Sequence, residues 1–425
     1  MADGTDSRPH VVILFLAEIR LRWGVTNRTD SGNAFRRLQT LSQQQTSTGP
    51  VDQLRTRAMG ITSTPKHSWW KNAMRRFTPI RVTAIAAVVL LLIVVGSSNW
   101  PAAQEGRVSD LGKLPVMRLP GDGFRGELPP LTVEQEALAK RLRQSVEHLA
   151  TEIGERNVLT FEKLERTANW LNQVLTDAGW DVERQLYDVD GKSCQNLIVE
   201  RHGITKPDEI VIIGAHYDSA ISAPGANDNG SGTAALLEFA QRFVKLEPER
   251  TLRLVFFTNE EPPHFQTDVM GSMVYARRCK AQKENITAVL SLETIGYYRD
   301  EPKSQKYPPP LGAIFPDQGN FIGFVADVNS GPLVNQVLSS FRNHAQFPSE
   351  ATSLPDKIQG VGWSDQWSFW KFGYPGVMIT DTAPFRYPHY HRRTDTPDKL
   401  NYERMARVVQ GLEKVIVDLV TFADE

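Results

Sequence analysis

The segment 209–218, EIVIIGAHYD, constrains the fold more than any other part of this sequence. Its apolar run is almost continuous, which is typical of a strand that is covered on both faces. Further strand patterns at 251–261, 286–296 and 375–381 alternate with helix patterns such as 231–244. This alternation predicts an α/β fold, a three-layer domain with a mostly parallel (mixed) central sheet flanked by helices.

We expect this domain to extend over residues 131–425. Thr132 and Gln135 have the spacing of a capping box, which marks the start of a helix. A closing helix is expected over 401–422, where apolar residues recur at helical spacing. No internal repeat interrupts the pattern, so a single domain is predicted.

A charge-free apolar run of 14 residues, VTAIAAVVLLLIVV, occupies 82–95 and follows several arginines. Its length lies between that of a signal-peptide core and the roughly 20 residues of a membrane-spanning helix. We therefore expect residues 74–99 to be either an export signal or a single membrane anchor. Both alternatives predict an exported protein, secreted or membrane-anchored at the periplasmic or extracellular face. The membrane would be a partner through 82–95 if the signal stays uncleaved.

The flanking segments have other compositions. Residues 1–73 are polar and basic, so we expect either a disordered basic arm or, because Met74 opens the signal-like stretch, a misassigned start. Residues 100–130 are rich in Gly and Pro and are expected to form a linker. A net charge of -1 lacks the basic excess of nucleic-acid-binding proteins, so we expect no nucleic-acid partner. Two cysteines are too few for a cysteine-ligated zinc site.

Polar side chains collect where the predicted strands end, which is where open α/β sheets carry their functional groups. They are His216, Asp218, Asp228, Glu260, Glu261, Glu293 and His391. Each alone has an ordinary interpretation, such as a hydrogen-bonded core histidine, a helix cap or a solvated face. Two imidazoles and several carboxylates together favour zinc, because carboxylates alone would suit magnesium or calcium better.

Seven motifs with these residues resemble a known family. They are GAHYDS, GANDNGSG, FFTNEEPP, MGS, LETIGYY, SDQWSFW and YPHYHRRTDTPDKL. In this order, over 209–400, they are similar to the co-catalytic two-zinc metallopeptidases that include bacterial leucyl-type aminopeptidases and glutamate carboxypeptidases. The resemblance implies the zinc-peptidase fold, two Zn²⁺ per chain and a peptide substrate.

The resemblance also implies a role for each side chain. The metal ligands would be His216, Asp228, Glu261, Glu293 and His391. Of these, Asp228 would bridge the ions, with His216 and Glu293 on one and the remaining two on the other. Glu260 would be the general base, and Asp218 would orient His216 from behind.

Two positions depart from the family pattern. Glu293 stands where many members have Asp, and Gln366 where related sequences often continue Ser-Asp with His. Tyr387 and Tyr390 flank the last ligand and are candidate oxyanion stabilisers, although packing is the more common role of such tyrosines. The Pro-rich stretch 298–319 either overhangs the cleft or is a surface excursion.

The expected function is a zinc-dependent exopeptidase, an aminopeptidase that hydrolyses N-terminal residues from peptides. A metal-bridged water would attack the peptide bond while a glutamate acts as general base. Two alternatives share the fold: a single-zinc glutaminyl cyclase-like acyltransferase and a non-catalytic receptor-like ectodomain. The number of zinc ions per chain would distinguish the three. The sequence does not decide the oligomeric state or the preferred side chain.

Overall fold

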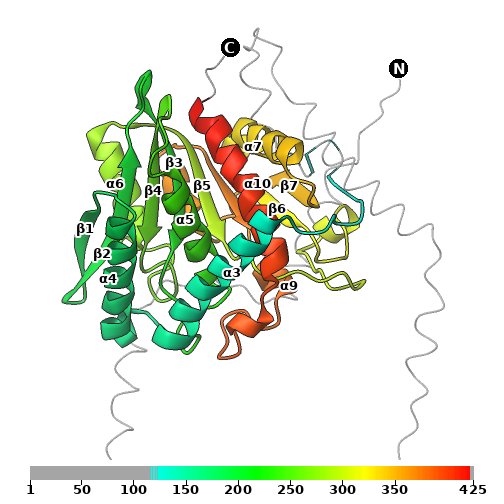
Figure 1. Cartoon of the computed structure of the whole chain (residues 1–425), viewed down its shortest axis with the longest axis horizontal. Coiled ribbons are helices and arrows are strands. Elements are labelled where there is room, and N and C mark those ends of the chain that lie inside the picture. Colours follow the sequence, from blue (N-terminus) through cyan, green and yellow to red (C-terminus); the bar gives the residue numbers. More distant parts are fainter. Residues whose placement is uncertain (1–115, 117, 120, 122, 422–425) are drawn as a thin grey trace, which may run out of the picture. The chain divides into compact units, whose positions relative to one another are not determined.

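The computed structural model describes residues 116–421 apart from 117, 120 and 122. Its eight strands form one sheet with the order β1-β2-β4-β3-β5-β8-β6-β7. The strands are β1 (Glu183–Val189), β2 (Lys192–Arg201), β3 (Lys206–His216), β4 (Arg250–Phe257), β5 (Asn285–Glu293), β6 (Ile322–Ala326), β7 (Ser349–Ser353) and β8 (Gly376–Thr380). Figure 1 shows this sheet and the helices around it.

The sheet is mixed. The four adjacent strands β4, β3, β5 and β8 run parallel to one another, as do β6 and β7. The pairs β1–β2, β2–β4 and β6–β8 are antiparallel. The predicted mostly parallel, mixed sheet is therefore confirmed. Because the central strands are parallel, their carboxyl ends meet at one edge of the sheet.

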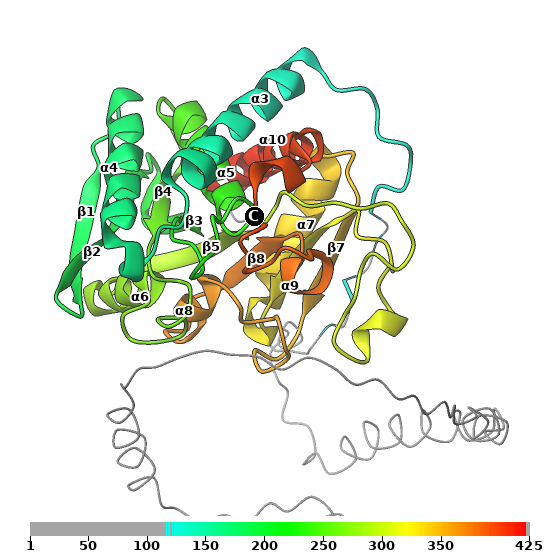
Figure 2. The ribbon, with the colours of Figure 1, turned by 90° about the horizontal axis from the view of Figure 1, so that it is seen from below.

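Helices cover both faces of this sheet. They are α3 (Val133–Glu147), α4 (Phe161–Asp177), α5 (Gly230–Phe243), α6 (Gly271–Gln282), α7 (Gly331–His344), α8 (Gln366–Trp370), α9 (Ala383–Arg386) and α10 (Tyr402–Thr421). A π-helical turn (His148–Ile153) extends α3. Figure 2 shows α3, α4 and α10 on one side of the sheet and α6 and α8 on the other. The predicted three layers are thus present.

Strand β3 explains why both layers are needed. Val211 and Ile213 lie in the larger core with α5, whereas Ile210 and Ile212 lie in the smaller core with Tyr275 of α6. Successive side chains of a strand point to opposite faces, so an apolar run exposes hydrophobic surface on both sides. Both faces must be covered, and this fixes β3 in the middle of the domain.

The predicted helix start at Thr132 is confirmed. The Gln135 N–H donates to Thr132 Oγ1 over 3.2 Å, and the Thr132 N–H donates to Gln135 Oε1 over 3.1 Å. This capping box satisfies two backbone donors that the first turn of a helix leaves free.

Part of the predicted linker belongs to the folded domain. Val116 forms an antiparallel bridge with Ser353, and the Leu119 N–H donates to the Ala351 carbonyl over 3.0 Å. Val116 and Leu119 therefore lie along the outer edge of β7, although they fall in the stretch that the sequence predicts to be a linker. The predicted arm (1–73), signal or anchor (74–99) and apolar run (82–95) lie outside the described residues.

Two further findings concern the described part of the chain. None of its helices combines the length and the apolar character that crossing a membrane requires. Cys194 and Cys279 are both buried and do not pair with each other.

Candidate metal centre

The candidate site is built at the carboxyl edge of the parallel strands. β3 ends at His216, whose backbone pairs with Phe257 at the end of β4. β5 ends at Glu293, and the loop after β4 carries Glu260 and Glu261. Asp228 enters from the loop directly before α5, whose N-cap residue Asn229 accepts the Gly232 N–H over 3.1 Å. Segments far apart in the sequence thus deliver their polar side chains to one place.

A first cluster combines His216, Asp228 and Glu293. Nε2 of His216 lies 3.1 Å from Oε2 of Glu293 and 3.5 Å from Oδ1 of Asp228. One ligand atom of each residue lies within 4.8 Å of the others, and all three side chains are buried. Three such donors around one point can hold a divalent cation.

A second cluster combines Asp228, Glu261 and His391. Nε2 of His391 lies 3.0 Å from Oδ2 of Asp228 and 3.0 Å from Oε2 of Glu261. One third of the His391 side chain (33%) is exposed, so this cluster is accessible from solvent. The two oxygens of Asp228 each face a different cluster, which is the arrangement that a carboxylate bridging two ions requires.

The unsatisfied atoms of the clusters fit a metal. Oε1 of Glu261 is buried and accepts no hydrogen bond from the described residues, and Oε2 of Glu261 and Oδ2 of Asp228 are buried beside Nε2 of His391 without a hydrogen bond of good geometry. An isolated buried carboxylate is unfavourable, whereas a bound cation compensates its charge. The mixed imidazole and carboxylate donors suit zinc better than calcium or magnesium.

Burial and the crowding of carboxylates also shift the pKa values of the two clusters. Burial and the neighbouring Asp228 raise the pKa of Glu261 to about 8, although His391 counteracts this. Burial would lower the pKa of His216, but the carboxylates of Glu260 and Glu293 outweigh it and raise that pKa well above its usual value. The crowded carboxylates therefore favour protonation of the glutamate and of the imidazole. Bound divalent cations would compensate the negative charge of the carboxylates more fully.

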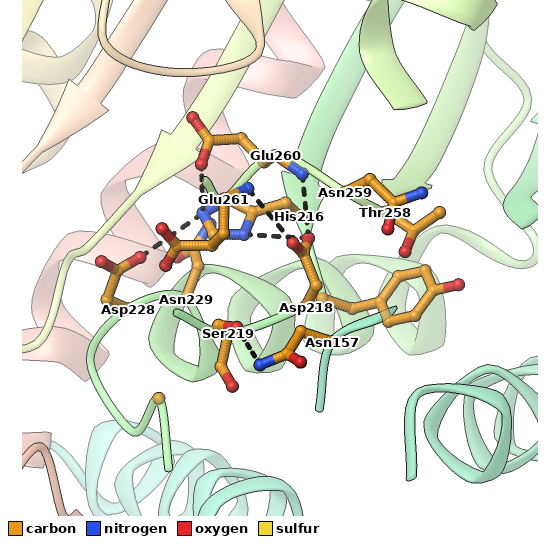
Figure 3. A network of polar contacts seen from close by, with 12 residues as sticks. Asn157, His216, Asp218, Ser219, Asp228, Asn229, Thr258, Asn259, Glu260 and Glu261 are labelled. Carbon is orange, nitrogen blue, oxygen red and sulfur yellow. Dashed lines mark hydrogen bonds and ion pairs between the residues drawn. The ribbon is translucent and has the colours of Figure 1, made fainter. Parts of the chain in front are cut away.

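Asp218 connects His216 to the glutamate pair (Figure 3). Its Oδ1 accepts the Glu260 N–H and its Oδ2 the Glu261 N–H, each over 3.2 Å. Oδ1 also lies 3.4 Å from Nδ1 of His216. This contact turns Nδ1 toward a carboxylate and leaves Nε2 free for the first cluster, which is how carboxylates orient metal-binding imidazoles.

Glu260 lies beside the clusters without belonging to either. Its Oε2 is 3.7 Å from Nε2 of His216, and only 6% of the residue is exposed. Burial raises its pKa well above the usual value, although His216 counteracts this. A carboxylate in this place can exchange a proton with a bound water molecule.

Two further residues position the candidate ligands, and neither received a role in the sequence analysis. Ser364 donates its hydroxyl to Oε2 of Glu293 over 2.8 Å. Asp395 accepts the Asn227 N–H over 2.8 Å and the Asp228 N–H over 3.2 Å. Ser364 opens the motif SDQWSFW, and Asp395 lies in the motif YPHYHRRTDTPDKL. Membership of these motifs was the sequence signal that could have indicated a role for both residues.

Three further side chains discussed in the sequence analysis lie around the site: Tyr387, Tyr390 and Gln366. Tyr387 donates its hydroxyl to Oδ1 of Asp395 over 2.8 Å, so this hydroxyl is already engaged. The Tyr390 ring stacks on the His391 ring with centroids 3.9 Å apart. Gln366 donates from Nε2 to the Val361 carbonyl over 3.1 Å.

A largely apolar pocket opens beside the first cluster. Its lining includes Glu293 and Tyr390 at the candidate metal centre. Its walls include residues of the Pro-rich stretch 298–319, for which the sequence left open an overhang of the cleft or a surface excursion. Part of that stretch, Tyr307 to Phe315, therefore does border a cavity next to the site.

The family model described as "Peptidase family M28" matches residues 196–416, just over half of the chain. The chain belongs to peptidase family M28. This is the co-catalytic zinc type of metallopeptidase that the motifs resemble, so the predicted family is confirmed and the protein is a peptide hydrolase.

The M28 chain is also similar to individual proteins and solved structures. The uncharacterized protein YfbL of Escherichia coli (strain K12) is 34% identical over 287 residues, which cover 65% of this chain and 87% of that protein. The probable aminopeptidase YDR415C of Saccharomyces cerevisiae is 25% identical over 60% of this chain and 66% of its own length. BSAP, a zinc aminopeptidase from Bacillus subtilis, has the same fold with a TM-score of 0.53 at 15% identity, covering 67% of this chain and 95% of that structure.

Proposed function

We propose that this M28 protein is an aminopeptidase that binds two zinc ions and removes N-terminal residues from peptides. The observation that carries the proposal is the pair of three-residue clusters that share Asp228, with Glu260 beside them. The family assignment supports peptide hydrolysis. The names of the yeast and Bacillus relatives support the choice of an aminopeptidase.

The side chains divide the work. His216 and Glu293 would hold one ion, Glu261 and His391 the other, with Asp228 between them. Bound zinc supplies Lewis-acid polarisation of the substrate carbonyl and lowers the pKa of a coordinated water.

Glu260 takes a proton from the attacking water and returns it to the leaving amine. Its position suits both steps, because the buried carboxylate lies beside the two clusters without belonging to either. Asp218 fixes the backbone on which Glu260 stands, so the carboxylate is positioned before the substrate arrives.

The test combines activity with metal content. Wild-type protein is assayed on a panel of aminoacyl peptides blocked or free at each end, and zinc is counted in each sample. We expect release of N-terminal residues from peptides with a free amino group, and about two zinc ions per chain.

The Glu260→Gln variant should keep both ions and lose about 10²- to 10⁴-fold in turnover, because proton transfer contributes that much in enzymes. Glu247→Gln, a change at an exposed glutamate, is the matched control and should behave as wild type. Activity retained in Glu260→Gln would remove this residue from the mechanism.

The same zinc count separates the alternatives. One ion per chain together with cyclisation of N-terminal glutamine would indicate a glutaminyl cyclase. An absence of both metal and turnover would indicate a receptor-like domain. Export remains a separate proposal, supported by the apolar run at 82–95, and is tested by locating the protein after fractionation of its native host.

A further inference from the structure

One row of residues crosses four strands from the candidate metal centre to the edge of the sheet. Glu293 of β5 is in register with Thr380 of β8, which is in register with Gly323 of β6. Gly323 is in turn in register with Glu350 of β7. Residues opposite each other in neighbouring strands share a face of the sheet. Strands lie about 4.8 Å apart, so the row carries the backbone from Glu293 to Glu350 over roughly 14 Å.

This row is the floor of the apolar pocket, because all four residues line it. Gly323 leaves the middle of the floor without a side chain, and a Cβ there would make a tight contact, 3.2 Å from the Thr380 carbonyl oxygen. The walls are apolar and aromatic, including Leu311, Phe315 and Trp363. A side chain entering beside the metal centre would therefore run along the row toward Glu350.

Glu350 is the charged group at the far end, and Arg118 neutralises it. Nε and Nη2 of Arg118 donate to the two carboxylate oxygens, each over 2.8 Å. The carboxylate side chain is 9% exposed and the arginine 31%. The Arg118 guanidinium also lies 6.0 Å from the ring centroid of Phe315, a wall of the pocket. Glu350 thus lines the end of the pocket with its charge compensated by Arg118, which lies behind it.

Arg118 reaches this place because the chain before α3 is attached to β7. Leu119 donates its backbone N–H to Ala351, and Val116 pairs with Ser353, on either side of the arginine. The side chain is consequently held against Glu350 by backbone contacts at both of its flanks.

Resting on the aminopeptidase function proposed above, we propose that the Arg118–Glu350 pair determines which N-terminal residues this protein accepts. The pocket takes a long uncharged side chain. A cationic side chain would lose its water without gaining a partner, because the carboxylate of Glu350 is already engaged by Arg118. An anionic side chain is excluded in the same way, since the arginine is engaged too.

Opposite single substitutions test this pair in the full-length protein. In Arg118→Gln the free carboxylate should raise kcat/KM for N-terminal Lys relative to Leu by at least 10-fold. In Glu350→Gln the free guanidinium should raise it for N-terminal Glu relative to Leu by a similar factor. A charge-assisted hydrogen bond in a partly buried site supports changes of this size. The double variant should return to the wild-type preference.

Arg141→Gln is the matched control. Arg141 likewise donates to both carboxylate oxygens of Glu238, from Nε to Oε1 over 3.1 Å and from Nη2 to Oε2 over 2.9 Å; Glu238 is buried, while 40% of the arginine side chain is exposed. This pair joins α3 to α5 and does not line the pocket. The control should lose stability comparably and leave the Lys/Leu and Glu/Leu ratios unchanged.

Affinities for the amides of Leu, Lys and Glu, measured by calorimetry, separate the two proposals. Absence of turnover in the wild type, with affinity ratios that still shift as expected, would contradict the aminopeptidase function and support the role of the pair. Turnover in the wild type with ratios unchanged in both single variants would overturn the role of the pair alone. If one single variant does not fold, the other and the double variant carry the same decision.

Discussion

The substitution Asp218→Asn removes one charge at the contact that joins three parts of the site. Asp218 accepts two backbone N–H groups, from Glu260 and Glu261, and faces Nδ1 of His216. Asparagine has almost the same shape but only one acceptor oxygen. Oδ1 of Asp218 faces both the Glu260 N–H and the imidazole, and Oδ2 faces the Glu261 N–H, so the NH₂ group of asparagine must face one of the two backbone N–H groups.

The structure sets the size of the effect. One buried backbone donor loses its partner, which costs about 1–3 kcal/mol of unfolding free energy. Loss of the carboxylate behind His216 should weaken zinc binding by about 10- to 100-fold, as for other groups that orient a ligand. Expressed in kcal/mol, the decrease in kcat/KM should exceed the decrease in unfolding free energy. The reason is that the backbone N–H of Glu260 is one of the two donors that Asp218 accepts.

The assay is a zinc titration against a competing chelator, together with denaturant unfolding and kcat/KM. Asp327→Asn is the control, because Asp327 is also a buried acceptor of a backbone N–H, from Ser330 over 2.9 Å, in the turn before α7. It should change zinc affinity less than twofold. A zinc affinity in Asp218→Asn within about twofold of wild type would refute the orienting role.

Three other predictions concern the metal, the core and the loop around Asp228. Protein in zinc at a hundredfold above Kd should be more stable than protein with its metal removed by a chelator, by about 3 kcal/mol of unfolding free energy or more. Calorimetry that shows equal melting with and without chelator would contradict the candidate metal centre. Leu412→Ala in α10, at a fully buried position, should cost about 2–5 kcal/mol in urea unfolding with unchanged zinc content, and a loss below 1 kcal/mol would mean that the helix packs differently. Tyr387→Phe removes a hydrogen bond to Asp395 and should cost about 0.5–1.5 kcal/mol, while kcat decreases more than zinc content because Asp395 holds the loop of Asp228; an unchanged kcat would assign Tyr387 to packing alone.

The central strands were predictable because burial on both faces leaves a continuous apolar pattern. β3 shows this in the residues Ile210 to Ile213. β7 was not predicted, because its sequence, SEATS, is polar although every residue is buried. It owes its burial to partners far away in the chain, such as Arg118, which pairs with Glu350. Tertiary contacts decide the state of such a short strand, and local propensity does not.

The candidate site follows the same division. His216, Glu261 and Glu293 could be named from the sequence because strand ends of parallel strands share an edge. Ser364 could not be given its role, since its contact with Glu293 depends on the path of a loop. The position of Glu260 beside the clusters agrees with the role that the family resemblance implied, which remains a prediction until the base is tested.

The contacts of Val116 and Leu119 with β7 also determine where a fragment of this domain can begin. A fragment that begins at residue 131, the boundary that the sequence suggested, would leave the outer backbone groups of β7 without their partners at Val116 and Leu119. Unpaired strand edges are templates for association with other chains. Such a fragment should self-associate through β7, whereas a chain that retains 116–130 should not.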